Sequence, residues 1–467
     1  MHELPEPLAE EGAKGRLDSL RIGALFALSH VAWACSPSPP ARPSTPEAPG
    51  CSDWPSRSGE LFVSLDGASK FEVEPFFVAR QGDLAIAWEA CGCDDLTRVG
   101  YIRRDATGGF DKPRYLASPN GQMASNVTLA RDGAGSLFAT WASWTPGPDP
   151  TQPHVRVSDI HIQFARWPAS AEEFEAPVEL SEPITDSLYD KPWMVLTADD
   201  RLVISYSDLR RGGILAVASA DGGASFQRAI VDPTMANLAA LCPDGRPGGA
   251  FVAYVASGFI RVAHTADGGV TWSPPVAAAV SDPSGNVAFQ DPTCIATGDE
   301  VWISYGRTLD GYDVPVQRLL GVYVAHLILG ASTPDSDVIV LDGADAGQTL
   351  SDAGAATGDG GVPPGFLLFP QLARRGDGRL AIAAYRAAGE GGGAADLVSV
   401  ISADGGRTFG NARTLATGLT PRLQRHVSDW LGDYFGCGPT AGGRGLSVAY
   451  VDNTSGFSHI VFDETVP

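Results

Sequence analysis

One eight-residue pattern occurs three times in this chain and constrains its fold more than any other feature. It reads S-A-D-G-G-A-S-F from position 219, T-A-D-G-G-V-T-W from position 265 and S-A-D-G-G-R-T-F from position 402. Each copy lies between two extended segments. Its two glycines supply the positive φ angles of a tight turn, and its Asp carboxylate can accept backbone N–H bonds. We therefore expect β-hairpins whose turns are held by Asp221, Asp267 and Asp404.

A longer repeat extends over the chain from about residue 60 onward. In each unit a strand pattern and a turn precede a second strand that ends in an aromatic residue. The seven aromatic residues are Trp88, Trp141, Tyr206, Tyr254, Tyr305, Tyr385 and Tyr450. Their spacing is about 50 residues once insertions are allowed, as in a four-stranded propeller blade. The pattern predicts an all-β fold, a closed β-propeller with seven blades, and six blades plus an irregular unit is the alternative.

The two ends of this region predict how the ring closes. After Tyr450 the pattern of only one more strand, S-H-I-V-F, remains, so the last blade lacks a fourth strand. The segment Leu61–Phe71 has a strand pattern and a degenerate copy of the eight-residue motif. Pairing this segment with the last blade would leave the ring without a free sheet edge.

The eight-residue motif resembles the Asp box of sialidase-like β-propellers, also called the BNR repeat. In that family the box is structural and closes the turn between the third and fourth strands of a blade. The segments Tyr189–Trp193 and Trp430–Tyr434 resemble stretches of bacterial proteins with such propellers. The resemblance covers roughly residues 60–463 and implies either glycan binding or glycoside hydrolysis. Sialidases have six blades and an R-I-P motif, whereas the first unit here opens with Glu74-Pro75.

Charge and motifs narrow the range of partners. Lys plus Arg total 33 against 55 Asp plus Glu, a formal net charge of −22. The body of the protein is therefore not expected to bind nucleic acid or an anionic membrane surface. No phosphate-binding loop, dinucleotide fingerprint or zinc pattern occurs, so we expect no cofactor and no metal. Residues 343–365 are rich in Gly and Asp but lack the closing Glu of an EF-hand, which indicates a surface loop. We expect a monomer.

The N-terminal part predicts export. Residues 1–35 contain a short apolar stretch, Ile22–Ala34, that is too short to span a bilayer and suits a signal peptide. It ends in A-W-A-C, which resembles the lipobox of bacterial lipoproteins and makes Cys35 the expected lipidation site. Ala32 and Trp33 depart from that motif, and an ordinary signal peptide is the alternative. Residues 36–59 are a Pro/Ser-rich linker, and 60–467 form the propeller. We expect a cell-envelope protein, either lipid-anchored in the outer membrane or secreted.

The remaining cysteines suggest disulfide bonds in an exported chain. Cys242 and Cys294 occupy equivalent points in the first strands of neighbouring units. They are expected to lie close enough for a bridge, and two small buried apolar residues are the alternative. Cys91 and Cys93 are too close in sequence to pair with each other comfortably.

The propeller topology selects candidate site residues. Asp boxes mark the turns between third and fourth strands, so the opposite face is built where first strands begin and second strands end. Candidates at the starts of first strands are Glu74, Asn126, Asp190, Lys191, Asn237, Asp291, Gln371, Asp433 and Tyr434. Candidates at the ends of second strands are Glu89, Asp208, Arg210, Arg307, Asp310, Tyr312, Arg386 and Asp452.

Two hypotheses for this face come from different functional classes. The first is a surface-anchored propeller that binds a glycan or a protein through residues such as Glu74, Glu89, Lys191, Trp193 and Asp291, with exposed aromatic residues such as Trp144. The second is a sialidase-like hydrolase, in which arginines bind a sugar carboxylate, a Tyr acts as nucleophile and a carboxyl group donates a proton. Its candidate catalytic residues are Asp190, Arg210, Arg307, Tyr312, Arg386, Asp433 and Tyr434. Arg307 is expected to be an exposed mouth residue that supports little packing.

Overall fold

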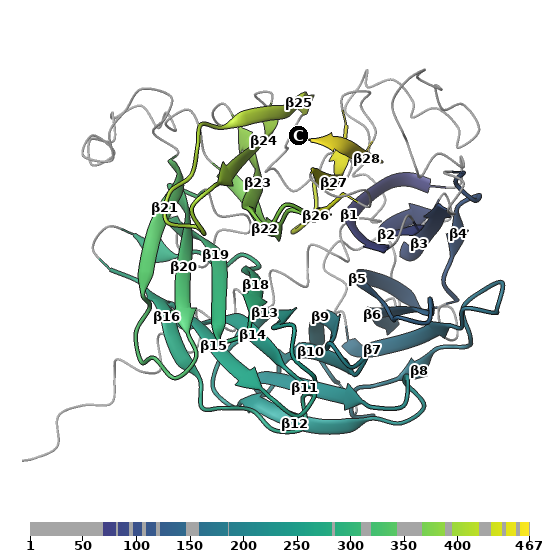
Figure 1. Ribbon diagram of the computed structural model, residues 1–467. Coiled ribbons are helices and arrows are strands. Elements are labelled where there is room, and N and C mark those ends of the chain that lie inside the picture. Colours follow the sequence, from purple (N-terminus) through teal and green to yellow (C-terminus); the bar gives the residue numbers. More distant parts are fainter. Residues whose placement is uncertain are drawn as a thin grey trace, which may run out of the picture.

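A computed structural model describes residues 69–80, 83–92, 97–104, 109–117, 122–145, 158–184, 186–282, 285–309, 319–342, 367–387, 395–419, 431–440, 445–453 and 458–466. These residues form 28 strands and no helix, so within them nothing helical could span a membrane. The strands build seven antiparallel sheets arranged as a ring (Figure 1). The prediction of a seven-bladed propeller is confirmed, and the six-bladed alternative is wrong.

Each blade is an up-and-down sheet whose first strand is innermost. Blades 1 to 3 consist of β1 (Ser69–Arg80), β2 (Asp83–Gly92), β3 (Thr97–Arg104), β4 (Arg114–Tyr115); β5 (Met123–Arg131), β6 (Leu137–Thr145), β7 (Ser158–Trp167), β8 (Val178–Glu179); β9 (Tyr189–Leu196), β10 (Leu202–Asp208), β11 (Ile214–Ser219), β12 (Gln227–Asp232). Blades 4 and 5 consist of β13 (Asn237–Pro243), β14 (Ala250–Ala256), β15 (Phe259–Thr265), β16 (Val276–Val280); β17 (Asn286–Val287), β18 (Thr293–Thr297), β19 (Glu300–Thr308), β20 (Gly321–Ile328), β21 (Ser336–Asp342). Blades 6 and 7 consist of β22 (Leu367–Arg374), β23 (Leu380–Ala387), β24 (Ala395–Ser402), β25 (Arg413–Leu419); β26 (Gly436–Pro439), β27 (Leu446–Asp452), β28 (His459–Val466).

The first and last blades are in contact, so the ring is closed by packing. Inner strands touch in sequence around the circle, and β26 touches β1. The rings of Phe77 and Phe462 lie 5.2 Å apart, edge to face, and Arg104 forms an ion pair with Glu464. The segment Leu61–Phe71 is predicted to pair with the last blade. This is wrong for the C-terminal end of the segment, since Phe71 pairs with Cys91 in blade 1. Its earlier part lies outside the described residues.

The repeated aromatic residues form the core between blades. The second strand of every blade has sheet neighbours on both sides and other blades above and below it, so both of its faces are buried. Trp88, Trp141, Tyr206, Tyr254, Tyr305, Tyr385 and Tyr450 are all at most 8% exposed. Burying such large side chains contributes most of the stabilisation that a turn-rich chain without helices has available. The sequence repeat is thus a repeat of the core.

The Asp boxes close the predicted hairpins. In the first box the Ser225 backbone N–H donates to the Asp221 carboxylate at 2.9 Å, and the Ser225 hydroxyl donates to it at 2.6 Å. Gly222 and Gly223 have φ angles of 70° and 90°, which a side chain would disfavour. Hydrogen bonds from Ser225 and Ser219 lower the pKa of Asp221 to about 2. Asp267 and Asp404 accept the corresponding bonds in the other two boxes.

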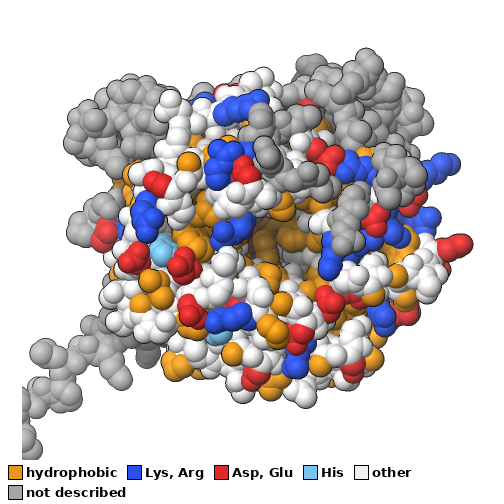
Figure 2. Space-filling view, in the orientation of Figure 1, with side chains coloured by type: hydrophobic (Ala, Val, Ile, Leu, Met, Phe, Trp, Pro, Cys, Tyr) orange, Lys and Arg blue, Asp and Glu red, His pale blue; other side chains and the backbone are white. Residues whose placement is uncertain are grey.

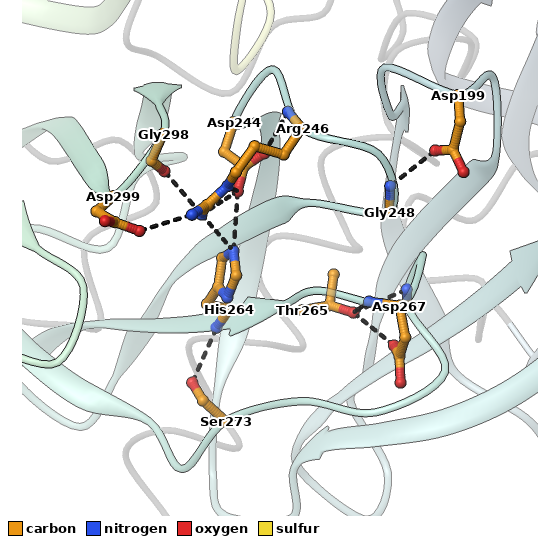
Figure 3. A network of polar contacts seen from close by, with 11 residues as sticks. Asp199, Asp244, Arg246, Gly248, His264, Thr265, Asp267, Ser273, Gly298 and Asp299 are labelled. Atoms are coloured by element: carbon orange, nitrogen blue, oxygen red, sulfur yellow. Dashed lines mark hydrogen bonds and ion pairs between the residues drawn. The ribbon is translucent and has the colours of Figure 1, made fainter.

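The first hairpins of neighbouring blades are joined on the same face as the Asp boxes. Arg246, between β13 and β14, donates to Asp244 of its own turn and to Asp299 of the next blade, at 2.8 and 2.6 Å. The buried Asp244 also lies 3.0 Å from His264 Nε2 (Figure 3). Arg201, in the first hairpin of blade 3, donates to the backbone oxygen of Asp267. First hairpins and Asp boxes therefore share one face, and the starts of the inner strands point to the other.

A disulfide joins two adjacent inner strands. Cys242 on β13 and Cys294 on β18 are bonded, with their Cα atoms 5.7 Å apart. The expectation that these residues lie within reach of a bridge is confirmed. Cys437 is a free thiol, and burial raises its pKa to about 12. The side chains of Cys35, Cys51, Cys91 and Cys93 lie outside the described part of the chain.

Candidate functional site

Five inner strands carry the same backbone distortion near the end where they begin. In each, a register shift against the second strand coincides with a non-glycine residue at positive φ. These residues are Glu74 (53°), Asn126 (54°), Lys191 (51°), Leu238 (57°) and Phe369 (51°). Side chains rarely adopt this conformation, which costs on the order of 1–3 kcal/mol and is found mostly at functional sites. The distortion therefore marks this end of the channel.

A cluster of charged groups fills this end, with Lys191 at its centre. The Lys191 ammonium nitrogen lies 2.6 Å from Asp433 Oδ2, 3.6 Å from Asp291 Oδ2 and 3.7 Å from Glu74 Oε1. These carboxylates come from blades 7, 5 and 1, so one side chain connects four blades. Lys191 is 4% exposed and Glu74 is fully buried, whereas the Asp433 side chain is 22% exposed. Asp433 is thus the member of the cluster that solvent reaches most readily. We call Glu74, Asp190, Lys191, Asp291 and Asp433 the Lys191 cluster.

Hydrogen bonds fix the remaining members of the Lys191 cluster. Asp190 Oδ1 accepts from Asn126 Nδ2 at 3.0 Å and from the Lys191 backbone N–H at 2.8 Å. Glu74 Oε1 accepts from the Asp433 backbone N–H at 3.2 Å. Gly432, with φ 86°, allows this contact, because a Cβ there would lie 2.7 Å from Glu74 Cγ. The backbone around Asp433 is therefore shaped to receive Glu74.

Burial changes the ionisation of these groups. Burial raises the pKa of Glu74 to about 8, of Asp291 to about 7 and of Asp190 to about 6, although Lys191 opposes each shift. Burial alone would lower the pKa of Lys191, but Asp433 and Glu74 raise it well above its ordinary value. At neutral pH the cluster therefore contains an ammonium group beside carboxyl groups that retain protons in part. Such a set offers both hydrogen-bond donors and acceptors.

The carboxyl group of Glu89 and the side-chain amides of Asn126 and Asn237 add polar groups to the same end of the channel. Glu89 is fully buried, and neither of its carboxyl oxygens has a hydrogen-bond partner. Burial raises the pKa of Glu89 well above its ordinary value, with Glu74 adding to the effect. Asn126 Oδ1 and Asn237 Nδ2 also lack partners. Buried polar atoms of this kind are uncommon and point to a ligand or to solvent.

Aromatic side chains lie next to the Lys191 cluster. The Lys191 ammonium lies 5.4 Å from the centre of the Tyr434 ring, and Trp193 packs edge to face on that ring and on Phe76. The Tyr434 hydroxyl donates to the Val127 backbone oxygen at 3.0 Å, and burial raises its pKa well above the ordinary value. Tyr434 is therefore held as a neutral donor. Trp144, expected to be exposed, is 2% exposed, because it faces the core between blades.

The three candidate arginines do not join the Lys191 cluster. Arg210 is half exposed and lies beside Asp186, and Arg386 lies 3.7 Å from Asp396. Arg307 is 6% exposed, pairs with Asp282 at 2.9 Å and stacks on Tyr323. The expectation of an exposed Arg307 is therefore wrong, because Tyr305, Tyr323 and Asp282 enclose it. None of the three bonds to a carboxylate of the cluster. Tyr312 and Asp310 lie outside the described residues.

The other candidates lie in the blades. Asp208 is buried and caps the turn after β10 by accepting from the Arg210 and Arg211 backbone N–H groups. Asp452 is buried at the end of β27, and Gln371 lines the channel further from the Lys191 cluster. Within the described residues no group of His, Cys, Asp and Glu is arranged to hold a metal ion.

The ionisation of the cluster predicts a pH dependence of stability. Each carboxyl group with a raised folded pKa keeps its proton in the native state while the unfolded chain ionises near pH 4. The stabilisation that comes from these bound protons is fully present below about pH 4. It is lost as the pH rises through the folded pKa values of Asp190, Asp291 and Glu74, which are about 6, 7 and 8. We expect the free energy of unfolding to be about 2–4 kcal/mol lower at pH 8 than at pH 5, less than three independent shifts would give, because the groups share Lys191.

Urea denaturation at the two pH values measures this difference. A Glu74→Gln variant cannot ionise at that position and should show a smaller difference than the parent. The Asp-box carboxylates, whose pKa values are lowered, ionise below pH 4 and do not contribute in this window. Stability that is constant or increases between pH 5 and pH 8 would contradict the ionisation scheme.

Comparisons with known proteins identify similar structures at low sequence identity. No family model matches the sequence, and no curated protein matches it. The Hadza microbial sialidase Hz136 aligns over 86% of this chain and 67% of its own, with 14% identity and a TM-score of 0.47. A Trypanosoma rangeli sialidase aligns over 72% of this chain and 55% of its own, with 12% identity and a TM-score of 0.47. A Dyadobacter fermentans protein of unknown function aligns over 74% and 95%, with 14% identity and a TM-score of 0.46. None of these matches assigns a role to a side chain of the Lys191 cluster.

Proposed function

We propose that this propeller binds a glycan at the mouth formed by the Lys191 cluster. The observation that carries the proposal is a buried ammonium group shared by carboxyl groups of three other blades, held on strained backbone. Structural needs alone do not favour such a group, since a buried ion pair is often no more stable than apolar residues of similar size. The partly exposed Asp433 side chain gives a ligand access to the Lys191 ammonium group.

The chemistry of the cluster favours neutral sugars. Hydroxyl groups both donate and accept hydrogen bonds, and the cluster offers an ammonium donor, protonated carboxyl groups and the partly exposed carboxyl group of Asp433. Trp193 and Tyr434 supply aromatic surface next to these groups. An acidic sugar would need a cationic clamp, but Arg210, Arg307 and Arg386 are bound elsewhere, and the net charge of −22 repels anions.

Glycoside hydrolysis is the second candidate, and one observation favours it. Burial raises the pKa of Asp291 to about 7, so it can donate a proton at neutral pH. Asp433, which contacts the same ammonium group, can act as the second carboxyl group of a two-carboxyl mechanism. A tyrosine nucleophile is not part of this proposal, because the Tyr434 hydroxyl donates to a backbone oxygen.

A glycan array followed by calorimetry tests the proposal, and a panel of aryl glycosides that includes sialosides tests turnover. We expect saturable binding of a neutral glycan, weakened about 10-fold in Asp433→Asn through loss of a charged hydrogen bond. Asp335→Asn is the matched control, because Asp335 is exposed and pairs with His326 on the opposite face. Turnover that is lost in Asp433→Asn would favour the hydrolase. If neither binding nor turnover depends on Asp433, the assignment of this mouth is wrong.

We propose further that the propeller is exported and anchored to a membrane by lipid on Cys35. The support is the apolar stretch that ends in A-W-A-C and the Pro/Ser-rich linker that follows it. Cys35→Ser is expected to remove the protein from the membrane fraction or to arrest its processing. Fractionation and gel migration of the variant in a bacterial host measure this. A variant that fractionates and migrates as the parent does would contradict lipidation at Cys35.

A further inference from the structure

A cavity of about 450 Å³ lies in the channel among β1, β9, β18, β22 and β26. Gly376, in the hairpin after β22, lines it, so the cavity extends toward the Asp-box face. Trp193 lines it as well and packs on Tyr434, next to the Lys191 cluster. Figure 2 shows hydrophobic side chains lining a hollow at the centre of the ring. The other aromatic residues of the cavity wall are Phe76, Phe77 and Phe435.

Gln371 turns its side chain toward blade 7. In the regular part of β22, Gln371 and Ala373 share one face, and Ala373 belongs to the apolar core that includes residues of blade 7. Leu372 and Arg374 leave the opposite face, where Leu372 joins the core shared with blade 5 and Arg374 stacks on Trp302 at 5.3 Å. Gln371 is therefore the polar side chain that β22 directs to the space between blades 6 and 7.

Cys437 lines the cavity from the opposite side of this space. A Cβ at Gly436 or Gly438 would lie 2.6 or 3.1 Å from the Phe77 ring, so these two positions face blade 1. Side chains alternate along a strand, and Cys437 between them therefore points toward blade 6. Gln371 and Cys437 both line the cavity, and burial raises the pKa of the Cys437 thiol to about 12. The wall that faces the Gln371 amide is thus neutral.

The Gln371 amide carries a hydrogen-bond donor without a partner. The residue is 4% exposed, and its Nε2 atom is buried and bonds to no acceptor among the described residues. A thiol sulfur is a weak acceptor, so Cys437 is a poor substitute for one. A buried donor in this state has lost its hydration without compensation. A ligand that brings an acceptor into the cavity would restore the missing hydrogen bond.

A neutral acceptor suits this donor better than a charged one. Of the two arginines that line the cavity, Arg375 pairs with Asp377 at 3.3 Å, and Arg374 is turned toward Trp302. Neither guanidinium is placed to neutralise an anion beside Gln371. No carboxyl group of the described residues lines the cavity, so a cation would lack a partner too. A buried charge without a partner is disfavoured far more than a buried carbonyl group that accepts a hydrogen bond.

We propose that this cavity binds a small, neutral, apolar molecule with one carbonyl group. The carbonyl oxygen accepts from Gln371 Nε2, and the apolar body lies against Phe76, Trp193 and Phe435. The cavity volume suits a ligand of one or two aromatic rings. This proposal does not depend on the glycan site, so either can be wrong without affecting the other.

Calorimetric titration with 2-acetonaphthone tests the proposal, together with two compounds that share its ring system. The hydrocarbon 2-ethylnaphthalene lacks the acceptor, and 2-naphthoate carries a negative charge. We expect saturable binding of the ketone. The hydrocarbon should bind about 3- to 10-fold more weakly, as loss of one neutral hydrogen bond predicts, and the carboxylate should bind more weakly than the ketone by about 10-fold or more.

Gln371→Leu keeps the volume of the side chain and removes the donor. It should lower the affinity for the ketone to that for the hydrocarbon and leave the affinity for the hydrocarbon unchanged. Gln227→Leu is the matched control, because Gln227 is an exposed glutamine of β12. Arg374→Gln should leave ketone binding unchanged, because Arg374 lies on the other face of β22. Melting temperatures of all variants confirm folding before affinities are compared.

Three results in the parent protein overturn the proposal, and none of them depends on a variant that folds. They are no saturable binding of the ketone, equal binding of ketone and hydrocarbon, and binding of the carboxylate that is as tight as that of the ketone. Among the variants, a folded Gln371→Leu protein that still prefers the ketone as the Gln227→Leu protein does would also overturn it.

Discussion

Replacement of Lys191 by Met is expected to lower the free energy of unfolding by about 3–5 kcal/mol at pH 8, the largest effect of any single substitution proposed for this chain. The Lys191 ammonium lies within 3.7 Å of carboxylates from blades 1, 5 and 7. Without it, Glu74, Asp190 and Asp291 must either ionise in a buried environment without a counter-charge or retain protons against the solution pH. Both alternatives disfavour the native state.

The loss should be smaller at pH 5, where the same carboxyl groups are protonated at little cost, because their pKa values lie at about 6 to 8. Urea denaturation at both pH values measures it. Lys112→Met is the matched control, since Lys112 is an exposed lysine of the same chain. A Lys191→Met protein as stable as the Lys112→Met protein at pH 8 would mean that the cluster is solvated and that the burial argument fails.

Removal of the disulfide is expected to have the next largest effect. Cys242 and Cys294 are separated by 52 residues, and closing a loop of that length restricts the unfolded chain by about 4 kcal/mol in the chain-entropy model. A Cys242→Ala/Cys294→Ala protein should therefore lose about 2–4 kcal/mol, since native strain and residual structure reduce the effect. Chemical denaturation under non-reducing conditions measures the difference.

Cys437→Ala is the comparison for the disulfide variant, because Cys437 is a free thiol in another inner strand, β26 of blade 7. It removes one sulfur without opening a loop, so it should change stability much less. Adding reductant to the parent should reproduce the stability of the double variant. Equal stability of the double variant and the parent would show that β13 and β18 are held together by packing alone.

The fold could be predicted from the sequence because each blade repeats the same physical solution. The aromatic residue of the second strand must be buried on both sides, so it recurs once per blade and identifies the blade, as Trp88 and Tyr385 illustrate. Asp boxes identify the outer turn through side chains that bond to their own backbone. Both signals are local in sequence. Closure was less predictable, since Phe71 pairs with Cys91 in the first blade.

The site was predictable only in part. Strand polarity placed Glu74, Lys191, Asp291 and Asp433 at one end of the channel, and these side chains meet there. Strand polarity does not determine whether a side chain points to the axis or into the space between blades, and for this reason the expectation of an exposed Arg307 is wrong. Its environment depends on Asp282 and Tyr323, which are distant in sequence. The strained backbone at Glu74 and Lys191 has no local signal, because the proline that follows each residue favours an extended conformation and not a positive φ angle.

The repeated bulge affects how such a ring can evolve. Five blades use one backbone distortion to display an acid, an amide, an amine, an aliphatic and an aromatic side chain. A substitution at one of these positions changes the chemistry of the mouth, while the strand pairing of its blade stays the same. New ligand preferences can therefore arise by single substitutions, one blade at a time, at the bulge positions other than Lys191, whose ammonium group the carboxyl groups of three other blades require.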